Sequence, residues 1–224
     1  MRKQIVVIGL GRFGVSLVSA LSRIGHDVLA LDIDEKSVQQ VASQVTHAVQ
    51  ADATNETILR QLGVGNFDIA IVTTPEMEPS VLSTILLKKL GVPYVIARAD
   101  SELHGSILEK IGADKVVYPE LEMGTMIAHV LTLGDVIDYI PVTGEYGVLK
   151  ISVSSYFIGK TLSELGFGRR SKSQAAVLLI QRKEDVIIGP SDSELINSGD
   201  VLVISGNWDK LEELFSHLEK AKKE

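Results

Sequence analysis

A glycine-rich turn near the start of the chain limits its fold more than any other feature. The apolar run QIVVIGL (residues 4–10) leads into Gly9-x-Gly11-x-x-Gly14, and a segment with helical periodicity follows directly. In such a turn the first glycine permits a sharp bend, the second lets a phosphate approach the backbone, and the third lets helix and strand pack closely. Free N–H groups at the helix N-terminus then face an anion. The turn therefore predicts a parallel α/β sheet that binds a nucleotide.

Five more short apolar runs follow, separated by amphipathic segments. Runs that are apolar at nearly every position are typical of parallel strands buried on both faces. The expected strands cover residues 4–10, 26–32, 46–52, 67–74, 93–99 and 114–119, and the expected helices cover 13–24, 35–44, 55–62, 79–90 and 102–111. Because crossovers between parallel strands are right-handed, we predict a Rossmann-like, doubly wound α/β domain over residues 1–120.

The pattern changes after this domain. Residues 121–138 are expected to form a crossover helix and linker, with Met123, Ile127, Val130 and Leu131 on one helix face. Spacings of three and four residues place side chains on the same face of a helix.

The remaining residues, 139–224, predict a small α+β domain. The expected elements are a strand at 146–153, a hairpin at 175–190 with its turn at Lys183–Asp185, a strand at 199–206 and a helix at 207–221. A break in the pattern near 136–144 separates this domain from the first. It is too small to be the substrate domain of most dehydrogenases.

Composition excludes several classes of function. The 224 residues include no cysteine, which excludes disulfides, thiolate metal sites and cysteine nucleophiles and favours a cytoplasmic protein. A formal net charge of −7 argues against nucleic acid or anionic lipid as a general partner. No apolar stretch approaches the roughly 20 residues of a membrane-spanning helix, so we expect no membrane insertion, and no signal peptide precedes the first strand.

The residues that end the predicted strands are the candidate ligands of a nucleotide, because open α/β sheets bind ligands at the carboxyl ends of their strands. Asp32 ends the second strand and is expected to accept hydrogen bonds from ribose hydroxyls. A carboxylate at this position disfavours a 2′-phosphate, so NADP is not expected. Asp34 either belongs to the site or caps the next helix.

Two further strand ends add to the candidate site. Asp52 is expected to receive the adenine amino group, with the backbone of Ala53 and Thr54 framing the ring, although capping of the next helix by Asp52 or Thr54 is the alternative. Thr73 and Thr74 end the fourth strand and are further candidates for the site.

Two arginines suggest a highly charged nucleotide. Arg12 lies inside the glycine turn beside Phe13, and Arg98 ends the fifth strand. A triphosphate carries more charge than the two phosphates of NAD, and guanidinium groups bind phosphates in a bidentate manner. An Arg12 that merely faces solvent is the alternative. The five histidines lack the spacing of metal ligands and are expected at the surface or at helix ends, and no hydrolytic base or hydride-transfer machinery is evident. The site is therefore expected to bind and not to react.

With these residues, the whole chain resembles the regulatory subunits of Trk- and Ktr-type potassium uptake systems, which contain an N-terminal and a C-terminal RCK (regulator of potassium conductance) domain. The resemblance depends on the segments VIGLGRFG, LDIDE, ADAT, LLKKLGVPYVIARA, HGSILEKIGADKVVYPELEMG, IGKTLSELGF, VIIGP and GDVLVISG. The segment LEKIGADKVVYPE is the most specific of these, because a dehydrogenase has no reason to carry it.

The resemblance implies that the first domain binds ATP or ADP, or NAD(H) as in some relatives, with Arg12 reaching towards the terminal phosphate. Glu120 would lie near the phosphates at a dimer interface and help to hold a divalent cation, Mg²⁺ or Ca²⁺. The helix after Glu120 would pack on a second copy of the chain. Homodimers would assemble into an octameric ring on the cytoplasmic face of an integral-membrane potassium-transporting subunit, and exchange of ATP for ADP would gate ion flux.

Alternatives to this function remain open. One is an NAD(H)-binding sensor or an NAD-dependent oxidoreductase, and another is a ligand-binding regulator of a process other than potassium transport. In several relatives the C-terminal domain binds cyclic di-AMP, and here Arg169, Arg170 and Lys172 are candidates for its phosphates. Their segment departs from the pattern of those relatives by its polar and basic residues, so a mobile basic loop is the equal alternative.

Overall fold

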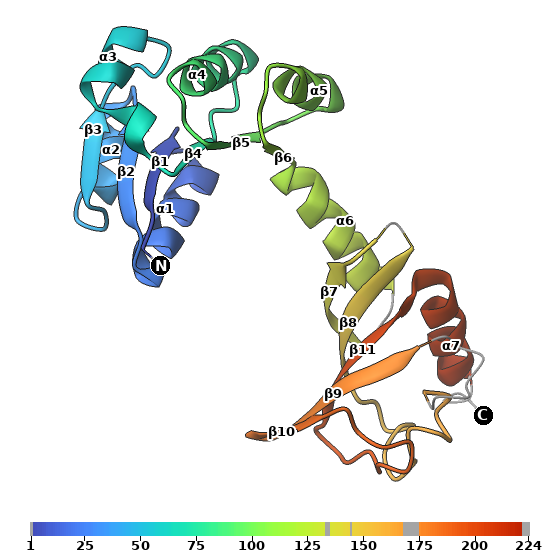
Figure 1. The fold of residues 1–224 in the computed structure, drawn as a ribbon. Coiled ribbons are helices and arrows are strands. Elements are labelled where there is room, and N and C mark those ends of the chain that lie inside the picture. The colour runs from blue at the N-terminus through green and yellow to red at the C-terminus, as the bar shows by residue number, and fades with distance from the viewer. Residues whose placement is uncertain (1, 133–134, 144, 168–174, 221–224) are drawn as a thin grey trace. The chain divides into compact units, whose positions relative to one another are not determined.

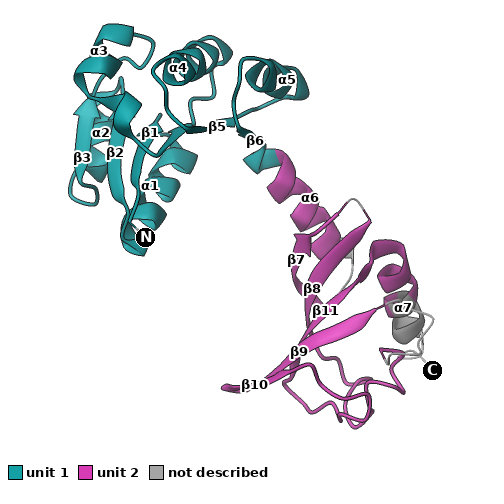
Figure 2. Ribbon diagram, viewed as in Figure 1, with its two compact units in different colours: residues 1–120 teal, residues 121–224 magenta. Residues whose placement is uncertain are grey.

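The chain divides into two compact units, residues 1–120 and 121–224, in the computed structural model (Figures 1 and 2). The structure describes residues 2–132, 135–143, 145–167 and 175–220. The cyclic di-AMP candidates Arg169, Arg170 and Lys172 lie outside the described residues.

The first unit contains a parallel sheet of six strands in the order β3-β2-β1-β4-β5-β6. The strands are β1 (Gln4–Ile8), β2 (Asp27–Asp32), β3 (His47–Gln50), β4 (Ile69–Val72), β5 (Tyr94–Arg98) and β6 (Lys115–Val117). The helices are α1 (Arg12–Ile24), α2 (Glu35–Val41), α3 (Glu56–Gln61), α4 (Met77–Lys89) and α5 (Glu102–Lys110), with a 3₁₀ turn at Val64–Asn66. The predicted Rossmann-like, doubly wound sheet is confirmed.

Both faces of this sheet are buried, which explains why its strands are apolar at nearly every position. On one face Ile5 and Val7 of β1 pack with Val18 of α1 and Val38 of α2. On the other face Val6 and Ile8 belong to a cluster with residues of α3, α4 and α5, namely Leu59, Leu87 and Leu108. Successive side chains of a strand alternate between its faces, so β1 contributes to both clusters.

The strand order reverses between β1 and β4, because the chain builds outwards through β2 and β3 and then returns to the other side of β1. The first connections from these two central strands leave in opposite directions, which opens a crevice at their carboxyl ends. The glycine turn and the threonines after β4 meet at this point.

The second unit contains an antiparallel sheet of five strands in the order β10-β9-β11-β8-β7. The strands are β7 (Val136–Pro141), β8 (Tyr146–Ser152), β9 (Ala176–Arg182), β10 (Asp185–Ile188) and β11 (Val201–Asn207), and the helix α7 (Trp208–Lys220) packs on them. The predicted α+β domain is confirmed. Strand β7 was not predicted, since the sequence indicated only a break near 136–144. As an edge strand it ends at Pro141, where a proline is tolerated.

In helix α6 (Pro119–Thr132), one of the residues predicted for the apolar face lies on a different face. Met126 and Val130 pack against the core of the second unit, whereas Met123, Ile127 and Leu131 are exposed. Val130 is therefore not on the apolar face that we predicted for it. These three exposed side chains form a stripe at spacings of four residues along the helix.

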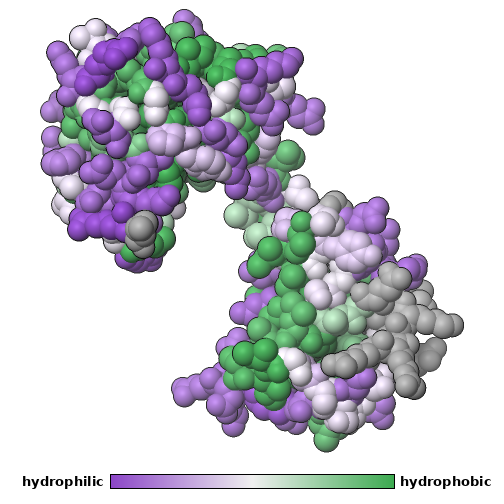
Figure 3. All heavy atoms as spheres, viewed as in Figure 1, coloured by the Kyte–Doolittle hydropathy of each residue, from purple (hydrophilic) through white to green (hydrophobic). Residues whose placement is uncertain are grey.

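Exposed hydrophobic side chains also gather on the second unit, as the green surface in Figure 3 shows. The two edge strands of this unit also carry exposed hydrophobic side chains, Ile140 of β7 and Ile188 of β10, which are 58% and 81% exposed. Clusters of exposed apolar side chains of this kind mark surfaces that contact another protein.

Candidate nucleotide-binding site

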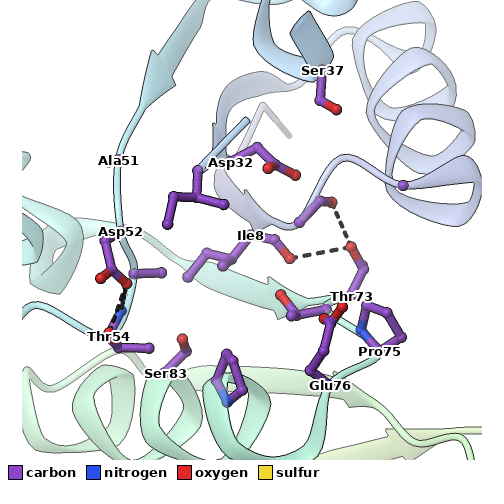
Figure 4. A pocket seen from close by; sticks show the side chains of 16 residues that line it. Ile8, Asp32, Ser37, Ala51, Asp52, Thr54, Thr73, Pro75, Glu76 and Ser83 are labelled. Carbon is purple, nitrogen blue, oxygen red and sulfur yellow. Dashed lines mark hydrogen bonds between the residues drawn. The ribbon is translucent and has the colours of Figure 1, made fainter. Parts of the chain in front are cut away.

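A cavity of about 530 Å³ lies at the carboxyl ends of β1, β2, β3 and β4 (Figure 4). Eight of the candidate residues line it: Gly9, Gly11, Asp32, Asp52, Ala53, Thr54, Thr73 and Thr74. The volume falls in the range of small-molecule and cofactor sites, which is about 300–1,000 Å³. The cavity thus coincides with the point at which the strand order reverses.

The three glycines of the turn have different structural requirements. Gly9 has a φ of 95°, and a side chain on it would come within 2.9 Å of the Thr74 backbone nitrogen. A side chain on Gly14 would collide with the carbonyl group of Gly9, so this position requires close packing of helix on turn. A Cβ on Gly11 would meet nothing within 4 Å. The space in front of Gly11 is therefore open to a ligand.

The N-terminus of α1 points its free amides towards this space. The first backbone hydrogen bond of α1 runs from the N–H of Val15 to the carbonyl of Gly11. The first turn of the helix contains no acidic residue. The N–H groups of Arg12, Phe13 and Gly14 therefore have no partner of the ordinary helical kind. Together with the helix dipole, these amides favour a bound anion such as a phosphate.

Asp32 connects the end of β2 to the glycine turn. One carboxylate oxygen accepts a hydrogen bond from the Leu10 N–H at 2.5 Å, and the other accepts one from the Asp34 N–H at 2.8 Å. Asp34 itself does not line the cavity and caps α2, because its side chain accepts a hydrogen bond from the Ser37 N–H at 3.0 Å. The Ser37 hydroxyl and backbone amide hold the pKa of Asp34 below its ordinary value.

Asp52 faces the opposite end of the cavity. It accepts hydrogen bonds from the Thr54 hydroxyl at 2.6 Å and from the Thr54 N–H at 2.8 Å, and these bonds hold the pKa of Asp52 below its ordinary value. Its carboxylate is therefore ionised at neutral pH. The helix cap is made by Asn55, whose side chain accepts from the amides of α3. Asp52 thus forms a local turn with Thr54 and retains an oxygen that can accept a donor from a base.

Thr73 braces the turn and is itself almost fully buried. Its hydroxyl donates to the carbonyl of Gly9 at 2.6 Å and lies 3.1 Å from that of Ile8. Thr74 lies against Gly9, as the short distance described above requires. Thr73 therefore fixes the end of β1 to the end of β4.

Arg98 and Glu120 form an ion pair outside the cavity lining. The Arg98 Nη2 atom lies 2.6 Å from the Glu120 Oε1 atom, and the Arg98 side chain is 16% exposed while that of Glu120 is 64% exposed. Arg12 is exposed at the first position of α1 and is not part of the lining either. Within the described chain, the two arginines are thus not brought together around the cavity.

Eight lining residues were not identified from the sequence: Ile8, Ile33, Ser37, Ala51, Pro75, Glu76, Pro79 and Ser83. Half of them, from Pro75 to Ser83, come from α4 and the segment before it. The signal for Pro75 and Glu76 was their position shortly after β4, the second central strand, whereas Pro79 and Ser83 lie on α4 and had no such signal. Figure 4 shows this wall opposite Asp32.

A hydrogen-bonded series of serine, histidine and aspartate side chains lies in the same unit, and it is not part of the cavity lining. His104 Nε2 is 3.1 Å from the Ser80 hydroxyl, and His104 Nδ1 is 3.0 Å from the Asp100 carboxylate. Both His104 and Ser80 are 0% exposed, so a substrate cannot reach them. The hydrogen bond between His104 and Ser80 joins α5 to α4. His104 thus lies in the first turn of α5, which agrees with the expected place at a helix end, but its side chain is buried.

Two searches of the described residues bear on other functions. No group of three or more histidine or acidic side chains there is arranged to hold a metal ion. Among the same residues, the helices are too short or too polar to cross a membrane.

Comparison with protein families identifies both units. The TrkA-N domain model matches residues 5–119, and the TrkA-C domain model matches residues 148–219. The chain is 40% identical over 208 residues to the Ktr system potassium uptake protein C of Bacillus subtilis, which covers 92% of this chain and 93% of the relative.

Solved structures share the fold. The structure described as the GsuK channel bound to NAD matches with a TM-score of 0.65 and 17% identity, over 96% of this chain and 40% of that one. The structure of GsuK bound to ADP matches with a TM-score of 0.51 and 18% identity, over 60% of this chain and 36% of that one. At these identities the similarity establishes the architecture alone.

Proposed function

Because the chain belongs to the TrkA-N/TrkA-C family of regulatory subunits of Trk- and Ktr-type potassium uptake systems, we propose that it binds an adenine nucleotide and thereby gates a membrane potassium transporter. The observation that carries the proposal is the cavity at the switch point between β1 and β4. It combines the free amides of α1 and the carboxylate of Asp32 beside the glycine turn with the carboxylate of Asp52 at the opposite end.

The parts of the cavity match the parts of an adenine nucleotide. The amides at Gly11 and at the start of α1 suit phosphates. The free lone pairs of Asp32 suit ribose hydroxyls, and the remaining oxygen of Asp52 suits the adenine amino group. The nucleotide acts as a signal, since a ligand shifts an equilibrium between two states by its difference in affinity for them.

ATP and ADP are the nucleotides that we propose. Arg12 lies beside the turn and is free to reach a phosphate that extends beyond it. Glu120 would help to hold Mg²⁺ or Ca²⁺ at the interface with a second copy, with one carboxylate oxygen on Arg98 and the other free for the cation. The chemistry fits, because both ions prefer carboxylate and phosphate oxygens.

The proposed assembly is a homodimer that builds an octameric ring. The exposed stripe of Met123, Ile127 and Leu131 on α6 supports the packing of this helix on a second copy. The ring would lie on the inner face of the cell membrane and contact the potassium-transporting subunit there, so that the chain itself does not enter the bilayer. A cyclic di-AMP site in the second unit is a further proposal that the described residues leave untested.

NAD(H) is the second candidate ligand, and a specific observation favours it. The residues that line the cavity include acidic side chains and no lysine, arginine or histidine, which suits a ligand of lower phosphate charge. The channel GsuK, which shares the fold, has been solved bound to NAD. In this case the chain would be an NAD(H) sensor with the same family role.

Isothermal titration calorimetry with ATP, ADP, AMP, NADH and NAD⁺, each with and without Mg²⁺, tests the proposal. Light scattering on the same samples measures the mass of the assembly. We expect ATP and ADP to bind and a ring of constant mass to form. Steady turnover of a dinucleotide with a small metabolite, or no binding of any adenosine phosphate, would overturn the proposal.

A further inference from the structure

The charge of the cavity wall is unusual for a site that holds phosphates. Its only titratable side chains among the described residues are Asp32, Asp52 and Glu76, and all three are acidic. A polyphosphate must therefore bind beside three carboxylates, and only the amides of the glycine turn and the dipole of α1 attract it inside the cavity. The position of each carboxylate then decides which part of the nucleotide it meets.

Two of the three carboxylates are already engaged. Asp32 accepts hydrogen bonds from two backbone amides, and Asp52 accepts two from Thr54. Glu76 is different, because it occupies the N-cap position of α4 without making a side-chain hydrogen bond to that helix. Its side chain is exposed on the wall of the cavity (Figure 4).

Glu76 lies at the phosphate end of the cavity. Thr74, two residues before it, is in contact with Gly9, where a Cβ would come within 2.9 Å of the Thr74 nitrogen and hydroxyl oxygen. The backbone around Glu76 is thus held against the glycine turn, on the side of the cavity that faces away from β2 and β3. Asp32 ends β2 and Asp52 follows β3, so in the proposed site they would meet the ribose and the base instead.

From this arrangement we propose that Glu76 selects nucleotides by the charge of their phosphates. The inference rests on the proposed function, since it concerns the same cavity. The carboxylate opposes each additional negative charge beyond the first phosphates, so free ATP is disfavoured relative to ADP, and ADP relative to AMP or a dinucleotide. A divalent cation chelated by the phosphates reduces their charge and removes most of this opposition.

The size of the effect follows from Coulomb's law in a solvent-exposed site. For a phosphate about 5–8 Å from the carboxylate, removal of the carboxylate changes the affinity for the ligand by about threefold for each phosphate charge that it faces. In chelator, Glu76→Gln should therefore strengthen ATP binding by about tenfold, ADP binding by about threefold and NAD⁺ binding by less than about twofold. With Mg²⁺ in excess, the gain for ATP should fall below about threefold.

Isothermal titration calorimetry of the full chain in EDTA and in Mg²⁺ measures these ratios. Glu78→Gln is the matched control, because Glu78 lies in the first turn of the same helix, is exposed and does not line the cavity. It removes the same charge from the same helix N-terminus, so any general effect on α4 appears in both variants. Thermal unfolding of each variant without ligand checks that the fold is retained.

A graded gain of ATP over ADP over NAD⁺ in Glu76→Gln alone, shrinking in Mg²⁺, supports the inference. Equal gains for the three ligands, a gain in Glu78→Gln as well, or a loss of affinity in Glu76→Gln would overturn it. If the unmodified chain bound none of these nucleotides, the proposed function would fail. If the unmodified chain bound them and Glu76→Gln left the affinities unchanged, only the inference about Glu76 would fail.

Discussion

The carboxylate of Asp32 accepts a hydrogen bond from the backbone N–H of Leu10 at 2.5 Å, so the acid that ends β2 directly braces the glycine turn after β1. Its second oxygen binds the Asp34 amide at 2.8 Å. Each carboxylate oxygen can accept more than one hydrogen bond, so a ribose can add its hydroxyls without releasing either amide. One side chain thus holds the shape of the phosphate loop and recognises the sugar.

Replacement of Asp32 should therefore reduce the affinity of the chain for every ribonucleotide. Hydrogen bonds to a charged group are worth about 1.5–3 kcal/mol each, so we expect Asp32→Ala to reduce the affinity for ATP, ADP and NADH by about tenfold or more. Calorimetry measures this loss, and thermal unfolding separates it from damage to the turn. A variant that binds the nucleotides as tightly as the original chain would contradict the assigned role.

Gly11 and Gly14 should respond differently to alanine. Gly14→Ala places a methyl group against the Gly9 carbonyl, so we expect a loss of about 2 kcal/mol or more in the free energy of unfolding of the first unit. Gly11 has φ −66° and open space around it, so Gly11→Ala should fold normally. It should nevertheless weaken nucleotide binding, because the methyl group enters the space of a phosphate. Normal binding by Gly11→Ala would show that phosphates do not approach this residue.

The sheet could be predicted from the sequence because burial on both faces leaves a direct signal. Val6 and Val7 are each 0% exposed although they point to opposite faces, so the run around them has no polar position. Strand β7 left no such signal, since Ile137 and Ile140 are exposed on an edge strand that ends at a proline.

The candidate site was predictable where it is built from strand ends and not where it is built from a helix. Asp32, Asp52 and Thr73 follow strands whose order the topology fixes. Pro79 and Ser83 reach the cavity only because of the way α4 packs beside the sheet, which no local pattern encodes. The pairing of Arg98 with Glu120 depends in the same way on tertiary structure, since α5 and β6 separate the two residues in the sequence.

Arg12 is expected to distinguish ATP from ADP. It lies exposed at the start of α1 and outside the cavity lining, and we propose that it meets the terminal phosphate of ATP. Arg12→Ala should reduce the affinity for ATP by about tenfold, because one charge-assisted hydrogen bond to the terminal phosphate is lost. The affinity for ADP should fall by less than about threefold. Arg23→Ala, in the last turn of the same helix, is the control. An equal loss for both nucleotides would mean that Arg12 does not bind the terminal phosphate.

Glu120 is expected to carry the effect of a divalent cation on the nucleotide-loaded assembly. Glu120→Gln should abolish the additional thermal stabilisation that Mg²⁺ or Ca²⁺ gives in the presence of ATP, while the affinity for ATP in EDTA stays within about twofold. Glu122→Gln, an exposed neighbour on α6, controls for the loss of charge. A full cation effect in Glu120→Gln would exclude this residue as a ligand. The readout differs from that for Glu76, whose effect is measured in chelator.

An ion pair between the half-buried Arg182 and the buried Asp200 should make the second unit sensitive to acid. Arg182 of β9 donates from Nε to one oxygen of Asp200 at 3.0 Å and from Nη2 to the other at 2.9 Å, and Asp200 is 1% exposed. Burial by itself would raise the pKa of Asp200, but the hydrogen bonds from Arg182 and from the Asn197 backbone outweigh it and hold the pKa below its ordinary value. Asp200 therefore stabilises the fold in its ionised form.

The direction of the pH dependence follows from this lowered pKa. The stabilisation is complete above the pKa of the unfolded chain, which is about 4, and is lost as the pH falls through the lower pKa of the folded chain. Asp200→Asn should reduce the free energy of unfolding at neutral pH by about 3 kcal/mol, because Arg182 loses its principal partner. The variant should also lose less of its remaining stability between about pH 5 and pH 2 than the original chain.

Urea unfolding followed by tryptophan fluorescence isolates this effect, because the single tryptophan of the chain, Trp208, lies in the second unit. Asp185→Asn, at the exposed start of β10, is the control that removes a carboxylate without a buried partner. The expected result is a shallower acid dependence for Asp200→Asn and an unchanged one for Asp185→Asn. Parallel pH profiles in all three proteins would show that the ion pair does not contribute to acid unfolding, and the stability of the second unit would then depend on its apolar core alone.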